Sequence, residues 1–298
     1  ALVFTNWNST LDAVSIVIQS GGTLTLPPAF PDTEPSNNIS VSCLNLLVEA
    51  GGSINADAKG YQGGNTNHLQ GYGPGGGFGI ANGGAGGGAY GGRGGFGYSY
   101  GQPGIPYGTA TNPVVPGSGG GASVQNYLGG PGGGVIRLAA LGTVTVDGTL
   151  SARGGNGTGQ IGGSHSAGHG SGGSIWVSCL TLAGNGLITA DGAVPLQFGQ
   201  PAFFMQGGGG GGGRIRVDYD TDAQALLPVP LLRLSANGGV NTISTDPNWY
   251  GDLGTVNLTD ARFLAADPLT HNGAIVIAGF TSWSPDHLTL SNARIRVP

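Results

Sequence analysis

The amino-acid sequence predicts an all-β fold, a solenoid-like stack of β units of about 40 residues with a packed polyglycine-II layer. The main observation behind this prediction is a repeat in which a glycine run opens onto a short aliphatic segment. The central isoleucines of three such segments are 39 and 40 residues apart, at Ile136, Ile175 and Ile215. A fixed period of this size is typical of stacked supersecondary units.

Composition supports this prediction and excludes several classes of protein. Glycine supplies 64 of the 298 residues without a Gly-X-Y period, which excludes collagen. Only 8% of the residues are charged, whereas disordered chains are usually rich in charge. The net charge is -5 with a single lysine, so nucleic acid is not an expected partner. The sequence contains no run of about 18 apolar residues, so it predicts no membrane span.

The individual elements follow from a second half of the repeat and from alternation. Each unit ends on an aliphatic residue, a small polar residue, alanine and a turn residue, as in Ile54–Asp57, Leu150–Arg153, Ile188–Asp191 and Leu234–Asn237. Apolar residues alternate along Val14 to Ile18, Val144 to Val146, Ile275 to Ile277 and Ile295 to Val297, which predicts half-buried strands. A short helix is expected only near Asp222 to Leu227.

One continuous domain is expected, in four parts. N-terminal β units occupy residues 1–60, a glycine-rich polyglycine-II insertion 61–131, the repeat units 132–240 and a C-terminal β region 241–298. Between residues 83 and 97, two of three period-three registers contain only glycine and alanine, which suits a packed polyglycine-II helix. The alternative is a flexible glycine-rich loop. The third register carries Tyr90, Arg93 and Phe96, and these residues with the nearby Tyr98 form a candidate contact surface.

Several phrases resemble glycine-rich repeat segments of large exported bacterial surface proteins. They are Gly119–Gly121, Gly129–Leu138, Thr143–Ala152 and Gly172–Val177, and the resemblance covers about residues 40–240. A weaker resemblance is to phage tail-tip adhesins with glycine-rich domains, whose loops contact a host receptor. Both resemblances imply an extracellular or cell-surface protein. The absence of a methionine at Ala1 agrees with an exported, processed chain.

Motifs for catalysis or metal binding are weak, and we expect neither an enzyme nor a cofactor or metal. His165 and His169 lack a third ligand nearby, and the stretch Asp218–Asp222 departs from a calcium loop at its sixth and twelfth positions. The best polar set is a ladder of turn residues, Asp57, Arg153, Asp191 and Asn237. It suits an alternating structural ladder better than an acid/base row of a polysaccharide-cleaving β-helix.

Two further sets of residues give testable expectations. Cys43 and Cys179 occupy the same repeat position with one unit between them, so we expect two buried free thiols instead of a disulfide. Sequons for N-glycosylation are present at Asn8, Asn38, Asn156 and Asn257.

The alternating strands near both ends suggest self-assembly. The candidate assembly strands carry Val14, Ile16 and Ile18 on one side and Ile295 and Val297 on the other. Edge pairing between them would join copies head to tail into an open filament. The expected function is an extracellular structural protein, a filament or surface-layer subunit, with itself as partner. The alternative is an adhesin for cell-surface glycans through the tyrosine-rich insertion, which includes Tyr100 and Tyr107; ice binding or polysaccharide cleavage is less favoured.

Overall fold

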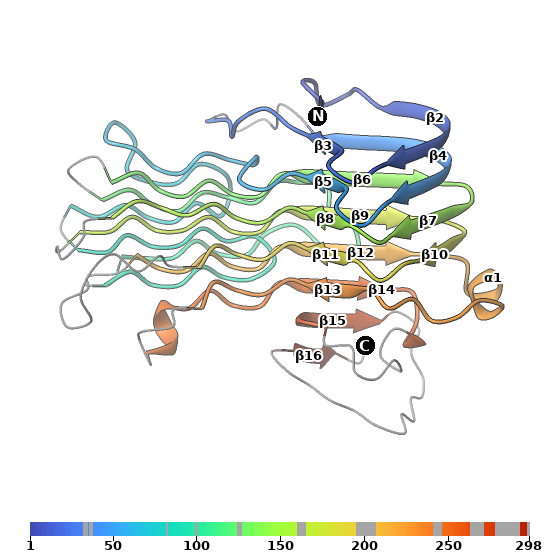
Figure 1. Cartoon of the computed structure of the whole chain (residues 1–298). Helices are drawn as coiled ribbons and strands as arrows, with labels where there is room; N and C mark the ends of the chain where they lie inside the picture. Colours follow the sequence, from blue (N-terminus) through green and yellow to red (C-terminus); the bar gives the residue numbers. More distant parts are fainter. Residues whose placement is uncertain are drawn as a thin grey trace.

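The computed structural model describes residues 1–31, 35, 38–81, 83–98, 101–123, 127–159, 165–194, 207–240, 246–262, 271–277 and 293–296. Within these residues the chain has three layers of extended backbone. Two parallel β-sheets face each other at one end of the molecule, and glycine-rich segments run out from them toward the other end (Figure 1).

The smaller sheet has six short strands, in the order β1 (Leu2–Val3), β3 (Thr23–Thr25), β5 (Ser53–Asn55), β8 (Thr149–Ser151), β11 (Leu187–Thr189) and β13 (Arg233–Ser235). The larger sheet has ten strands. Nine follow in the order β10 (Thr181–Ala183), β7 (Thr143–Val146), β4 (Ile39–Val48), β6 (Val135–Ala140), β9 (Ser174–Ser178), β12 (Arg214–Asp218), β14 (Thr255–Leu258), β15 (Gly273–Ile277) and β16 (Ala293–Arg296), and β2 (Leu11–Ile18) pairs with β4. The larger sheet curls because β4 is long enough to pair with both β6 and β7.

The core lies between the two sheets and follows from the alternation of apolar residues. In the larger sheet, Ile136, Ile175 and Ile215 are in register on neighbouring strands. In the smaller sheet, Leu150 and Ile188 are in register in the same way. All five side chains are fully buried in one hydrophobic cluster. Side chains alternate between the two faces of a strand, so these rows point into the core and the adjacent residues of each strand point away from it.

The predicted solenoid-like stack is wrong. The strands form two separate parallel sheets, and the larger one curls instead of stacking in uniform units. The step along the chain is also uneven: from Val256 on β14 to its partner Ile275 it is 19 residues, and from Ile39 to Ile136 it is 97. Parallel sheets are most familiar from α/β proteins, although this chain has almost no helix in its described part. A sequence period reports which residues align, but it does not determine how many sheets the aligned strands form.

The glycine-rich segments contact one another at backbone distance. One row of hydrogen bonds crosses five of them: the amide of Ala193 donates to the Gly170 carbonyl, Gly210 to Ala193, Gly239 to Gly210 and Gly251 to Gly239, at 2.7–3.1 Å. The segments are not β-strands, yet their backbone groups find partners in neighbouring segments, as burial requires. We refer to this part as the glycine layer.

Helix is confined to two short pieces in the described residues. The α1 helix (Thr221–Ala225) begins after Asp220, whose side chain accepts hydrogen bonds from the amides of Asp222 and Ala223. It falls where the sequence predicts a short helix. A single 3₁₀ turn spans Pro247–Trp249. Neither described helix has the length and apolar character needed to cross a bilayer.

Candidate functional site

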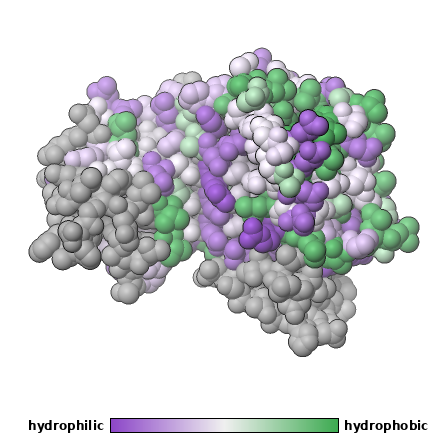
Figure 2. Space-filling model, viewed as in Figure 1, coloured by the Kyte–Doolittle hydropathy of each residue, from purple (hydrophilic) through white to green (hydrophobic). Residues whose placement is uncertain are grey.

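The most exposed apolar element is the edge strand β2. It pairs with β4 on one side, and no described strand pairs with its other side. The side chains of Val14 and Val17 are 74% and 51% exposed. Figure 2 shows hydrophobic surface at the upper right of the view, where Figure 1 places β2 and β4. Long, apolar and unpaired edges are templates for pairing with another chain.

The predicted assembly residues do not all belong to this exposed surface. Val14 is exposed, whereas Ile18 is buried and Ile16 packs against the core. At the opposite end of the same sheet, Ile295 lies on β16, which pairs with β15. Val297 lies outside the described residues. Strict alternation would put all three residues on one face, but residues 12–15 of β2 are all exposed. The burial therefore alternates only from Ile16 to Ile18, and Val14 does not share their buried environment.

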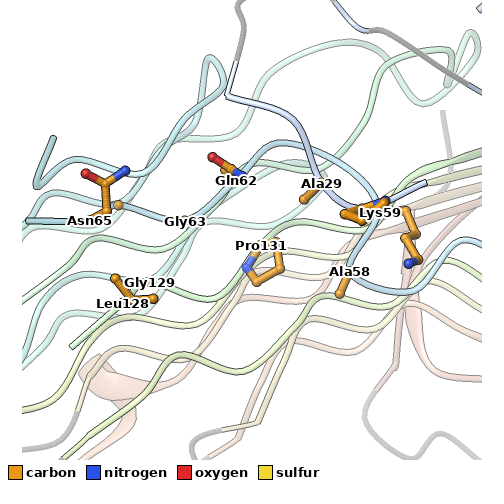
Figure 3. Close-up of a pocket in the computed structure, with 11 residues that line it drawn as sticks. Ala29, Ala58, Lys59, Gln62, Gly63, Asn65, Leu128, Gly129 and Pro131 are labelled. Carbon is orange, nitrogen blue, oxygen red and sulfur yellow. The ribbon is translucent and has the colours of Figure 1, made fainter. Parts of the chain in front are cut away.

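A groove on the glycine layer is the second candidate site. It has a volume of about 470 Å³ and lies between the segments that carry residues 28–29, 58–65 and 128–131. Figure 3 shows Lys59 at one end of the groove and Asn65 at the other, with Gln62 and Pro131 between them. Leu128 and Pro131 supply apolar walls, and glycines supply much of the rest. The composition is therefore mixed, with polar groups set among apolar surface.

The charge of this groove differs from that of the whole chain. Lys59 is the chain's only lysine, and no carboxylate is among the described residues that line the groove. Within the described residues, the side chains of Lys59 and Gln62 form no hydrogen bond or ion pair. The Oδ1 of Asn65 accepts from the amides of Asn67 and His68, which leaves its NH₂ group as a donor. Sequence reasoning did not identify this site, although one lysine among nearby amides was a usable signal.

Tyr90 does not belong to an exposed contact surface. Its side chain is fully buried, and its hydroxyl hydrogen-bonds the Ser174 hydroxyl at 2.7 Å. Its ring contacts Tyr107 at 4.9 Å and lies 5.2 Å from the Arg214 guanidinium. Burial raises the pKa of Tyr90. Tyr90 instead packs against Ser174 of β9 and Arg214 of β12.

The buried cation Arg214 was also missed by sequence reasoning. It pairs with no carboxylate in the described part of the chain. Its guanidinium donates to the carbonyl of Tyr107 at 2.8 Å and to the hydroxyl of Thr255 at 3.1 Å. Burial lowers its pKa. Arg214 therefore joins the insertion to the larger sheet, and its position directly after a glycine run was the available signal.

The other three residues of the predicted contact surface are partly exposed. Arg93 forms an ion pair with Asp252 at 3.4 Å, and its guanidinium lies 5.2 Å from the Phe96 ring. Tyr98 contacts Trp249 edge to face at 5.9 Å. These contacts tie the insertion to the segment near the 3₁₀ turn.

The two neighbouring histidines occupy different environments. His169 is buried, and its Nδ1 accepts a hydrogen bond from the Gly157 amide at 3.2 Å. Burial lowers its pKa to about 4. His165 lies near Tyr127, with ring centroids 6.4 Å apart. In the part of the chain that the structure describes, no three histidine, cysteine or acidic side chains gather around a common point.

The turn ladder is assembled in the predicted order. The Asp57 carboxylate accepts from the Ser151 hydroxyl at 2.5 Å and from the Arg153 amide at 2.6 Å. Asp191 repeats the arrangement with Ser235 and Asn237, at 2.6 and 2.7 Å. Each carboxylate thus caps the turn of the next strand, which supports a structural role for the ladder.

The cysteine prediction is confirmed, since Cys43 and Cys179 are both free and buried. Burial raises the pKa of the Cys179 thiol to about 12. Of the four sequons, those at Asn8 and Asn156 are exposed. Asn38 and Asn257 are buried, so the folded chain has no room for a glycan on them.

The exposed edge and the groove are the two surfaces that the geometry offers for function. Compared with known proteins, the chain matches no family model, no curated protein and no solved structure.

Proposed function

We propose that this protein is an extracellular structural subunit whose copies assemble head to tail. The observation that carries the proposal is the edge of β2 that no described strand pairs, with its exposed Val14 and Val17. The extracellular location rests on the resemblance of the glycine-rich repeats to exported surface proteins. An edge of eight residues is long for a strand left unpaired.

The direction of the strands favours a filament over a closed dimer. The strand pairs in both sheets are parallel. Among the described strands, β2 and β16 lie toward opposite ends of the larger sheet, and each is paired on one side. Pairing the β2 edge of one copy with the β16 edge of the next continues the sheet with the same polarity. The two surfaces in such a contact differ, and a heterologous contact that does not close generates an open polymer.

The energy available to this contact comes from the backbone and the valines. Complete burial of a valine-sized side chain contributes about 1.5–3 kcal/mol. Each new backbone hydrogen bond adds about 0.5–1.5 kcal/mol. The side chains of Val14 and Val17 point to the faces of the sheet, so pairing at the edge covers them only in part and the backbone hydrogen bonds supply most of the energy.

The test replaces Val14 and Val17 together by lysine, the residue that most often protects natural edge strands. We expect the wild-type chain to form polymers in negative-stain images and in sedimentation velocity, and the double variant to sediment as a monomer. Val194→Lys is the matched control, because this valine is exposed to a similar degree but lies outside the strands. Unchanged circular dichroism shows that the variants fold.

Two outcomes contradict the proposal. A wild-type chain that stays monomeric over the whole accessible concentration range would show that the edge does not pair. Polymers of undiminished length in the double variant would place the contact elsewhere.

A further inference from the structure

We propose that the Lys59 groove binds an acidic saccharide, that is, a sugar unit carrying a carboxylate. The groove has about 470 Å³, within the range of about 300–1,000 Å³ that is usual for small-molecule sites. It lies on the glycine layer, whereas β2 belongs to the larger sheet (Figures 1 and 3). The inference therefore stands apart from assembly and does not depend on it.

The charge of the groove selects for an anion. Among the described residues that line it, Lys59 is the only charged one, in a chain with 15 acidic and 10 basic residues. The nearest acidic residue in sequence, Asp57, already accepts hydrogen bonds from Ser151 and Arg153. Among the described lining residues, the ammonium of Lys59 therefore has no competing carboxylate. Its flexible four-carbon stem lets it follow a ligand carboxylate along that end of the groove.

The remaining groups suit a sugar better than a simple anion. Gln62 supplies a carboxamide with both donor and acceptor atoms, and Asn65 supplies its NH₂ group. Such amides pair with hydroxyl groups, which also donate and accept. Figure 3 shows these side chains spaced along the groove from Lys59 to Asn65, an arrangement that fits an extended ligand with several polar groups.

The apolar walls complete the match. Pro131 and Leu128 present carbon surface beside the polar side chains, and Pro28 adds to it at the side of the N-terminal segment. A sugar ring carries C–H groups on its faces and hydroxyls at its rim, so it can contact both kinds of surface at once. Small sites generally combine apolar lining with a few placed polar groups in this way.

The experiment measures binding of trigalacturonate to the full chain by isothermal titration calorimetry, with neutral galactotriose and sodium acetate as comparison ligands. We expect the acidic trisaccharide to bind most tightly. Lys59→Gln should weaken its binding about tenfold to hundredfold, as expected for loss of one charge-assisted hydrogen bond. Lys59→Arg should retain most of the affinity. Added salt should weaken binding to the wild type more than to Lys59→Gln.

Control variants make the result specific to the groove. Arg137→Gln removes an exposed cation on β6 that does not line the groove, and it should leave the affinity unchanged. Gln62→Ala should weaken binding of the acidic trisaccharide without altering that of acetate. Every variant should still assemble like the wild type.

Three results would overturn the inference as a whole, and a fourth would overturn its assignment to a saccharide. The three are no detectable binding of trigalacturonate at millimolar concentration, equal binding of galactotriose, and equal loss in Lys59→Gln and Arg137→Gln. Binding of acetate as tight as that of the trisaccharide would overturn the assignment to a saccharide. None of these results bears on assembly, which is measured separately by sedimentation.

Discussion

Gly210 occupies one of the closest backbone contacts of the glycine layer, and replacing it by alanine is the sharpest test of how that layer is held together. An added Cβ would fall on the Gly170 carbonyl, 2.6 Å from its carbon and 3.0 Å from the Ala193 nitrogen. These two groups form the hydrogen bond from the Ala193 amide to the Gly170 oxygen. The methyl group therefore intrudes directly on a bond between two segments.

The expected cost follows from the groups that lose their partners. Gly170 and Ala193 are both buried, so breaking their bond leaves one donor and one acceptor unsatisfied. Each unsatisfied buried group costs about 1–3 kcal/mol. The reduced freedom of the unfolded chain offsets about 0.4–1 kcal/mol of this cost. Gly210→Ala should therefore lower the free energy of unfolding by about 1–6 kcal/mol, a large share of a typical 5–15 kcal/mol.

Urea unfolding followed by circular dichroism measures this change. Gly21→Ala is the control, since a Cβ there meets no atom within 4 Å and only the left-handed backbone is strained, at φ 77°. That strain costs about 1–2 kcal/mol. If Gly210→Ala unfolds at the same urea concentration as the wild type, the segments are not packed at backbone distance and the reasoning fails.

Two further predictions concern single buried side chains. Burial lowers the pKa of His169 from an ordinary 6.5 to about 4. Between pH 4 and pH 6.5 the unfolded chain therefore binds a proton at this residue, whereas the folded chain does not. Stability should therefore fall as the pH drops from about 6.5 to about 4, by up to about 3 kcal/mol, and level off below. Urea midpoints at pH 7 and 4.5 check this, and His169→Gln should flatten the dependence; an equal slope in both proteins would refute it. Tyr90→Phe removes the hydrogen bond to Ser174 but keeps the ring in place, so thermal unfolding should show a loss of about 1 kcal/mol. If the variant is as stable as the wild type, this hydrogen bond makes no net contribution to the free energy of unfolding.

The alignment of the core residues could be predicted from the sequence. The regular spacing of Ile136, Ile175 and Ile215 predicts that they occupy equivalent places, and they are in register on neighbouring strands. The free thiols could be predicted for the same reason, because Cys43 and Cys179 share a repeat position separated by one unit. Local spacing is sufficient here, since each strand simply pairs with its neighbours along the repeat.

The candidate sites were harder to predict. Tyr90 was expected on an exposed face, and it is fully buried beside Arg214. A period of three identifies the residues on one face of a segment, but it does not say whether solvent or another segment covers that face. The Lys59 groove also escaped prediction, because its walls come from residues 28–29, 58–65 and 128–131, far apart in the chain.

The sequence alone determined the strands, their shared register and the reduced state of the cysteines, because these depend on alternation and spacing within the repeat. Tertiary structure decided that the strands form two parallel sheets, that Tyr90 and Arg214 are buried, and that β2 is left as an open edge. These features depend on which distant segments pack together. That choice balances buried area and backbone hydrogen bonds over the whole molecule, and no single stretch of residues records it.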